Sequence, residues 1–173
     1  MLIFSQKALR NWIPPMGSVI ITDLDECSVD SDHRRSFHDF DGELDIPAWH
    51  TDGTPENIAL DVLRPWGVRF AELGEERKDC IFGVCTSREF ITADYDWVQK
   101  HLKVQRNSGM IWHRETGCTE SRESLKHRLF VQNIRKDFDL LLAVNNGKMY
   151  FFDDKVKNVL EAESLGLIGV LVY

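Results

Sequence analysis

The sequence has 173 residues, of which 43% are hydrophobic and 28% are charged, and its formal net charge is -7. This length and composition indicate one globular domain with a sizeable core, and the acidic balance argues against a general nucleic-acid coat protein. The four cysteines have no CxxC spacing. We therefore expect neither a disulfide scaffold nor a zinc site, and a reducing cytoplasm is the expected location.

The first third of the chain predicts a lead-in, a strand and an insertion. Residues 1–17 have no long apolar run, which predicts neither a signal peptide nor a membrane span but a short helix closed by Pro14 and Pro15. A buried strand is expected over 18–22. Residues 28–55 lack a helical or strand period and are expected to form a small cap-like insertion. Thr54 and Pro55 predict a helix start, followed by an apolar helical face over 58–63 and a second helical piece over 66–76.

Strands and helices alternate through the rest of the chain. Apolar runs predict strands over 79–85, 110–113, 149–152 and 167–172. Helical spacing of apolar residues predicts helices across 95–102, 123–138 and 156–164, the last of which ends at Gly166. This alternation is typical of a parallel sheet covered by helices on both faces. We therefore expect an α/β fold in a single domain over residues 1–173.

Charge is unevenly distributed along the sequence. Residues 22–61 contain twelve Asp or Glu against two Arg, a net charge of -10, whereas residues 99–136 contain nine Lys or Arg against three Glu, a net charge of +6. An acidic catalytic end facing a basic segment suits a metal ion and a phosphorylated ligand. Two solvated faces of opposite sign explain the same pattern equally well.

Residues that suit phosphoryl transfer recur after the predicted strands or on the long helix. Taken alone, each has an ordinary explanation, such as a capping aspartate, a turn threonine or a solvated lysine. Together they are more specific, because chemistry in open α/β sheets lies beyond the carboxyl ends of the strands. The set consists of Asp23, Asp25, Thr86, Lys126, Asp153 and Asp154.

In order and type, this set resembles the haloacid dehalogenase (HAD) superfamily of phosphotransferases, over nearly the whole chain from Val19 onward. The resemblance implies a three-layer, Rossmann-like HAD fold. It implies that Asp23 is the nucleophile that becomes an aspartyl phosphate, and that Asp25 protonates the leaving oxygen and then activates water. Thr86 would hydrogen-bond a transferring phosphoryl oxygen, and Lys126 would neutralise negative charge.

A magnesium ion is expected at the same place. Several carboxylates beside a phosphate dianion repel it, and a hard, oxygen-binding cation together with a lysine offsets that repulsion. The resemblance implies that the ligands of Mg²⁺ are Asp23, Asp25, Asp153 and Asp154.

Within the superfamily, the chain is most similar to the 3′-phosphatase domain of phage-type polynucleotide kinase–phosphatases. TSRE at 86–89 is similar to that family's SGRE, and RETGCTESRESLK at 114–126 resembles its RExGxT segment, with the lysine at the same spacing. The resemblance implies that arginines contact the substrate phosphate or strand, because a guanidinium can bind phosphate bidentately. The implied substrate-binding residues are Ser87, Arg88, Arg114 and Arg34, with Arg35 as an alternative to Arg34.

The sequence departs from the family pattern in three places. Glu26 and Cys27 stand where the first motif usually has Gly and Thr. Arg122 stands where the family often has an acidic residue. The family's metal pair falls at 145–146, which is Asn-Asn here. We place the metal pair at Asp153 and Asp154 instead, because only that pair ends an apolar strand and opens a helix.

Three functions therefore remain open from the sequence. The first is a Mg²⁺-dependent phosphatase acting on a nucleic-acid 3′ end; the sequence contains no GxxxxGK[ST] motif, so this would be a module without the kinase half. Such a module suits a phage or a nucleic-acid repair operon, with the protein in the host cytoplasm. The second is a phosphatase acting on a small metabolite or nucleotide, with the acidic insertion as a lid. The third is a binding module that has lost catalysis.

Overall fold

The computed structural model describes residues 1–31, 33 and 53–173. Over these residues the core is a six-stranded sheet, and every neighbouring pair of strands in it is parallel. The strands stand in the order β1 (Leu2–Phe4), β8 (Ile168–Val172), β7 (Met149–Asp153), β2 (Val19–Thr22), β5 (Ile81–Glu89) and β6 (Ile111–Arg114). A separate antiparallel pair joins β3 (Val29–Asp30) to β4 (Val62–Leu63).

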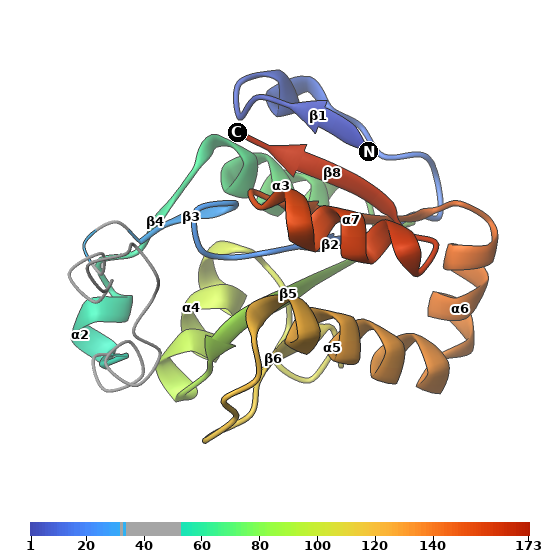
Figure 1. The fold of residues 1–173 in the computed structure, drawn as a ribbon. Coiled ribbons are helices and arrows are strands. Elements are labelled where there is room, and N and C mark those ends of the chain that lie inside the picture. The colour runs from blue at the N-terminus through green and yellow to red at the C-terminus, as the bar shows by residue number, and fades with distance from the viewer. Residues whose placement is uncertain (32, 34–52) are drawn as a thin grey trace.

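Helices cover both faces of the sheet, as Figure 1 shows. Consecutive residues of β7 point to opposite faces. Phe151 meets Phe130 on one face, with ring centroids 4.8 Å apart, and Phe152 stacks on Trp66 on the other, at 4.1 Å. The helices are η1 (Ala8–Asn11), α2 (Pro55–Ile58), α3 (Pro65–Glu76), α4 (Thr92–His101), α5 (Arg122–Lys136), α6 (Phe138–Asn145) and α7 (Val156–Ser164).

The predicted fold class is confirmed, and several elements agree closely with the sequence pattern. The helix predicted over 156–164 is α7, and the strand predicted over 149–152 is β7, which extends by one residue to Asp153. Thr54 caps α2 as predicted, because its hydroxyl accepts a hydrogen bond from the Asn57 N–H. None of the described helices is both long and apolar enough to cross a lipid bilayer.

Three local predictions are wrong. Residues 1–17 do not form one helix, because Leu2–Phe4 add β1 in parallel to β8 before the short η1. The helical face expected over 58–63 ends at Ile58, and Val62–Leu63 pair with β3 instead. The helix expected over 123–138 breaks at Asp137, whose carboxylate caps α6 by accepting from the N–H groups of Asp139 and Leu140.

The predicted insertion over 28–55 is described only at its two ends. Its first residues form β3, which pairs with β4, so the start of the insertion is tied to the segment that follows it. Arg34, which was predicted to contact substrate, and its alternative Arg35 lie outside the described residues.

Helix α3 packs closely against the turn that follows β2. At Gly67, a Cβ atom would lie 2.1 Å from the carbonyl oxygen of Ser28. Only a residue without a side chain allows this approach of helix to backbone. The position of the turn after β2 therefore depends on Gly67.

We expect Gly67→Ala to lower the free energy of unfolding by about 1–3 kcal/mol, because backbone must move to relieve the overlap. Urea unfolding measures this. Gly74→Ala in the same helix is the matched control, since its nearest atom would be 3.9 Å from the new Cβ. That variant should be neutral or more stable by up to about 1 kcal/mol, because Ala is the better helix former. Equal losses in the two variants would contradict the close approach at Gly67.

Candidate active site

Asp23 lies directly after β2, in the middle of the sheet. Its N–H donates to the carbonyl of Phe152 at 2.8 Å, which continues the ladder to β7. Its carbonyl accepts from the hydroxyls of Ser28 at 2.6 Å and Thr22 at 2.9 Å. The backbone of Asp23 is thereby fixed on both sides, and its carboxylate lies at the carboxyl end of the parallel strands, where α/β proteins place their chemistry.

Glu26, which stands where the family motif has glycine, lies in the turn after Asp23. Glu26 has φ of 63°, a left-handed conformation that favours glycine. Its carboxylate forms an ion pair with Arg64, next to the start of α3. The side chain at the usual glycine position thus has a partner that ties the turn to the next helix.

Cys27, at the usual threonine position, is buried with its Sγ 3.7 Å from the Thr22 hydroxyl oxygen. Burial raises the pKa of its thiol well above the ordinary value. Its carbonyl accepts from the Gln6 side-chain amide at 2.8 Å, and the amide oxygen of Gln6 accepts from the N–H of Trp66 at 2.8 Å. The N-terminal segment therefore braces both the turn and α3.

A buried lysine joins two aspartates at the centre of the site. The Nζ of Lys126 lies 3.0 Å from Oδ2 of Asp23 and 2.6 Å from Oδ2 of Asp153. Burial by itself lowers the pKa of Lys126, but Asp153 and Asp23 outweigh it and raise that pKa above its usual value. The ammonium therefore stays charged, and it supplies the positive charge that this cluster of carboxylates requires.

Asp153 ends β7 and is held by the first turn of α7. Its Oδ1 accepts from the N–H of Lys155 at 2.8 Å, and the side-chain amide of Asn158 donates to both carboxylate oxygens at 3.1 and 3.0 Å. Asp154 is less buried and pairs with the side chain of Lys155 at 2.8 Å. The placement of the acidic pair between a strand and a helix agrees with the sequence prediction.

Asp23, Asp153 and Asp154 form a group that fits a hard cation. Each offers a carboxylate oxygen, and these oxygens lie within 4.8 Å of one another. Oδ1 of Asp23 is buried and has no hydrogen-bond partner within the described part of the chain. An unpartnered buried carboxylate oxygen beside two further carboxylates is the donor set that Mg²⁺ prefers. The fourth predicted ligand, Asp25, does not belong to this group.

Asp25 is turned toward Arg88 instead. Oδ1 of Asp25 lies 2.5 Å from Nη2 of Arg88 and also accepts from the hydroxyl of Ser31 at 3.0 Å. Thr86 lies within β5, which continues to Glu89 rather than ending at residue 85 as the sequence suggested. The Thr86 hydroxyl is buried and accepts from the N–H of Arg88 at 3.1 Å.

The two described arginines that were predicted to contact substrate bind protein groups. Arg88 is buried and forms ion pairs with Asp25, Asp61 and Asp94. Arg114 is also buried and donates to three carbonyls of nearby backbone, those of Ser87 at 2.9 Å, Cys118 at 2.8 Å and Glu120 at 2.7 Å. Arg114 therefore orders the loop that leads into α5 and Lys126, and Ser87 is tied to it through its carbonyl.

Sequence reasoning missed four residues that support the site. These are Asn158, which orients Asp153, Gln6, which braces the turn, and Asp61 and Asp94, which bind Arg88. Asn158 carries a weak signal, since it lies one helical turn beyond the acidic pair. Gln6 and Asp61 lie at least 21 residues from their partners in the sequence, so no local pattern marks them, whereas Asp94 lies six residues after Arg88.

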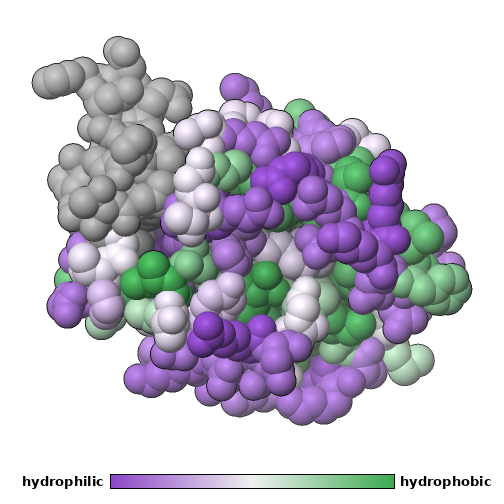
Figure 2. Space-filling model, turned by 90° about the horizontal axis from the view of Figure 1, so that it is seen from below, coloured by the Kyte–Doolittle hydropathy of each residue, from purple (hydrophilic) through white to green (hydrophobic). Residues whose placement is uncertain are grey.

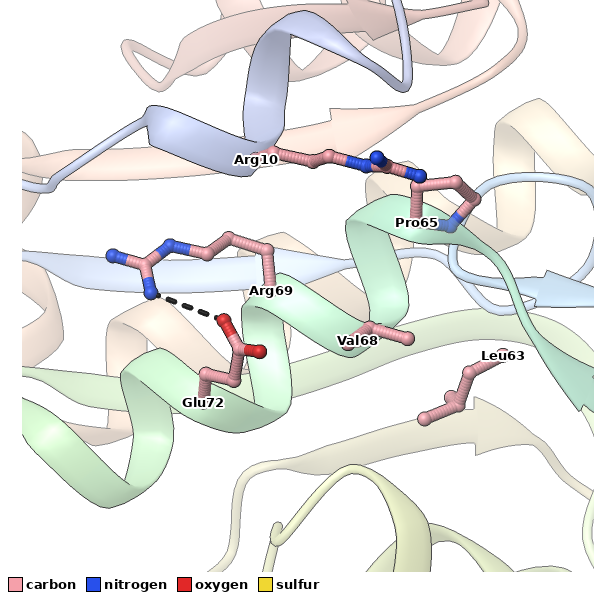
Figure 3. A pocket seen from close by; sticks show the side chains of 6 residues that line it. All are labelled: Arg10, Leu63, Pro65, Val68, Arg69 and Glu72. Carbon is pink, nitrogen blue, oxygen red and sulfur yellow. Dashed lines mark hydrogen bonds and ion pairs between the residues drawn. The ribbon is translucent and has the colours of Figure 1, made fainter.

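One pocket of about 500 Å³ lies between η1 and the start of α3, as Figure 3 shows. Arg69 and Glu72 form an ion pair at 3.2 Å at its edge. The lining residues are Arg10, Leu63, Pro65, Val68, Arg69 and Glu72. None of the predicted catalytic or metal-binding residues lines it, so this pocket is separate from the acidic cluster.

The parallel six-stranded sheet, flanked by helices and carrying the acidic cluster at the carboxyl ends of β2 and β7, has a Rossmann-like architecture. Among solved structures, the chain is similar to a haloacid dehalogenase-like family hydrolase from Streptococcus pneumoniae, at 13% identity and a TM-score of 0.55, over 87% of this chain and 81% of that one. No protein-family model and no curated protein matches the sequence. At this identity the likeness concerns the fold.

Replacing Lys126 by Met should lower the free energy of unfolding by about 3–5 kcal/mol without divalent metal, because the two buried aspartates lose the charge between them. Urea unfolding with a chelator present measures the loss. Lys136→Met, at the exposed end of the same helix, is the control and should change stability by no more than about 0.5 kcal/mol. A Lys126 variant as stable as this control would contradict the role of the buried pair.

Magnesium affinity should rise as the pH approaches about 8. Burial raises the pKa of Asp23 to about 8, Lys126 opposes the shift, and Asp153, Asp154 and Asp25 add to it. The folded metal-free protein therefore retains a proton on Asp23 that Mg²⁺ must displace, so affinity grows as that proton leaves. Titration calorimetry in buffers of different ionisation enthalpy should show proton release. Asp139→Asn, at an exposed residue of α6, should leave the trend unchanged. An affinity for Mg²⁺ that does not change up to about pH 8 would contradict the prediction.

Proposed function

We propose that the protein is a Mg²⁺-dependent phosphatase that works through an aspartyl phosphate on Asp23. The observation that supports this best is the buried cluster of Asp23, Lys126 and Asp153, with Oδ1 of Asp23 unpartnered among the described residues. A carboxylate held beside a buried ammonium, with one oxygen unengaged, suits attack on phosphorus. When bound, Mg²⁺ would supply further positive charge at the three carboxylates.

In the first step, a carboxylate oxygen of Asp23 forms a bond to phosphorus while the bond from phosphorus to the leaving oxygen breaks. The proton that the leaving oxygen needs comes from the carboxyl group of Asp25. The Thr86 hydroxyl and the Lys126 ammonium would bind the oxygens of the transferring phosphoryl group. The products are the free alcohol and an aspartyl phosphate, with Asp25 ionised.

In the second step, water attacks phosphorus and gives its proton to the Asp25 carboxylate. The bond between phosphorus and the Asp23 oxygen breaks, which releases inorganic phosphate and restores both aspartates to their starting states. One carboxylate thus acts as nucleophile and the other carries a single proton back and forth. This division of labour requires Asp25 to occupy a fixed position near the leaving oxygen.

The substrate that we propose is a 3′-phosphorylated nucleic-acid end. Two features of the sequence support it: the segment 114–126, which resembles the polynucleotide 3′-phosphatase pattern, and the net charge of +6 over residues 99–136. Exposed Lys100, Lys103 and Arg106 lie in that basic segment, on α4 and just beyond it. A small phosphorylated metabolite is the alternative substrate, and the same assay distinguishes the two.

The deciding assay is phosphate release from a 3′-phosphorylated oligonucleotide, with and without Mg²⁺. We expect Mg²⁺-dependent release that falls at least about 10³-fold in Asp23→Asn, because an amide cannot replace the nucleophile. Thymidine 3′-monophosphate and a sugar phosphate are compared in parallel. Asp139→Asn, an exposed aspartate on α6, is the matched control and should retain full activity.

Each outcome assigns the protein to a different function. Preference for the oligonucleotide supports a 3′-end phosphatase, whereas release from the small substrates alone supports a metabolite phosphatase. Release from none of them, combined with no binding of beryllium trifluoride in the presence of Mg²⁺, contradicts the phosphatase proposal and favours a binding module.

A further inference from the structure

We propose that Arg88 is a positioning residue that holds the proton-carrying Asp25 in place, rather than a residue that contacts substrate. The proposal rests on the phosphatase function proposed above. It reassigns an arginine whose sequence context suggested contact with phosphate. Three independent features of the described residues support it.

The first feature is the fork of contacts between the two side chains. Nη2 of Arg88 lies 2.5 Å from Oδ1 of Asp25, and Nε lies 3.4 Å from Oδ2. Two N–H groups of one rigid plane therefore face both oxygens of one carboxylate. Such a pairing fixes the orientation of the carboxylate as well as its position.

The second feature is what holds the other side of the guanidinium. Nη1 donates to Oδ2 of Asp61 at 2.8 Å and to Oδ1 of Asp94 at 3.0 Å. Oδ2 of Asp94 accepts from the N–H of Ile91 at 3.0 Å, which anchors that carboxylate at the start of α4. Arg88 is only 4% exposed. Its guanidinium is thus directed to carboxylates of three separate segments rather than to solvent.

The third feature lies in the backbone of β5. The pairing of β5 with β6 shifts register between Cys85 and Glu89, so the strand is irregular where Thr86 and Arg88 lie. Such irregularities re-aim side chains near active sites. The N–H of Arg88 binds the Thr86 hydroxyl at 3.1 Å. One residue thereby positions two groups of the proposed chemistry, Asp25 through its side chain and Thr86 through its main chain.

This arrangement predicts a particular kind of catalytic defect. Asp25 matters most when the leaving oxygen needs a proton, as in an alkyl phosphate, and least when the leaving group departs readily, as in p-nitrophenyl phosphate. Loss of positioning at Arg88 should therefore affect the two substrates unequally. A defect that is merely structural lowers the amount of active enzyme and affects both substrates to the same extent.

The test compares kcat/KM of the wild type and Arg88→Lys for β-glycerol phosphate and p-nitrophenyl phosphate, with Mg²⁺ present. Lysine keeps the positive charge among the buried carboxylates but lacks the fork. We expect the loss for β-glycerol phosphate to exceed the loss for p-nitrophenyl phosphate by about tenfold or more, within the range that general acid catalysis contributes. Circular dichroism and thermal unfolding confirm that the variant is folded.

Two further variants keep the test decisive. Asp94→Asn removes a carboxylate that holds Nη1 while leaving Asp25 and Arg88 in place, and it should show the same unequal loss to a smaller degree. It serves in place of Arg88→Lys if that variant fails to fold. Arg77→Lys alters an exposed fork with Asp79, formed at 2.8 and 2.7 Å, and should change neither substrate.

The outcomes separate the two proposals. An active wild type whose Arg88→Lys variant loses both substrates equally, or neither, overturns the positioning role and leaves the phosphatase function standing. A wild type that hydrolyses neither substrate nor the 3′-phosphorylated oligonucleotide contradicts the phosphatase function itself. A larger loss for β-glycerol phosphate, repeated in Asp94→Asn and missing in Arg77→Lys, supports the role assigned to Arg88.

Discussion

The buried ammonium of Lys126, placed between Asp23 and Asp153, is the interaction on which the rest of the site depends. Carboxyl groups so far from water either retain a proton or need a positive charge beside them. The fold meets this requirement by bringing together three distant segments. Strands β2 and β7 are neighbours in the sheet and deliver the two aspartates, and α5, whose Phe130 packs on Phe151 of β7, delivers the lysine. The charge balance of the site therefore depends on the order of the strands.

A second charge network extends from the first toward the insertion. Arg88 connects Asp25, in the turn after β2, to Asp61 and to Asp94 at the start of α4. Asp61 lies just before β4, so the segment that follows the insertion is joined to Asp25 through a single guanidinium. The network of Lys126 balances charge around Asp23, and the network of Arg88 fixes the geometry around Asp25.

The elements that the sequence predicted well are those whose patterns are local and complete. Helix α7 begins after an acidic pair and ends before Gly166, whose φ is 88°, so both of its ends are marked in the sequence. Strand β1 was missed because two of its three residues are exposed and because it pairs with β8, at the other end of the chain. The break between α5 and α6 was missed because a capping Asp137 looks like one more polar residue on a helix.

The candidate site, like the fold, was predicted from the sequence only in part. The sequence indicated Asp23, Lys126, Asp153 and Asp154 through their order along the chain, and the structure brings these four together. The partners of Arg88 and Arg114 could not be deduced, because an arginine beside a phosphate and an arginine beside buried carboxylates or carbonyls look alike in sequence. The difference is set by tertiary contacts over 27 residues or more in the case of Asp61 and Asp25.

The surface seen from the side of α5 and β6 is mainly hydrophilic, with small apolar areas between charged side chains (Figure 2). An aromatic cluster lies beneath the surface, where Trp12 packs edge-on against Trp66, Tyr150 and Phe152. The indole N–H of Trp66 donates to the hydroxyl of Thr22 at 3.0 Å, one residue before the proposed nucleophile. The fluorescence of Trp66 should therefore report on the turn that bears Asp23, because a shift of that turn alters the surroundings of the indole ring.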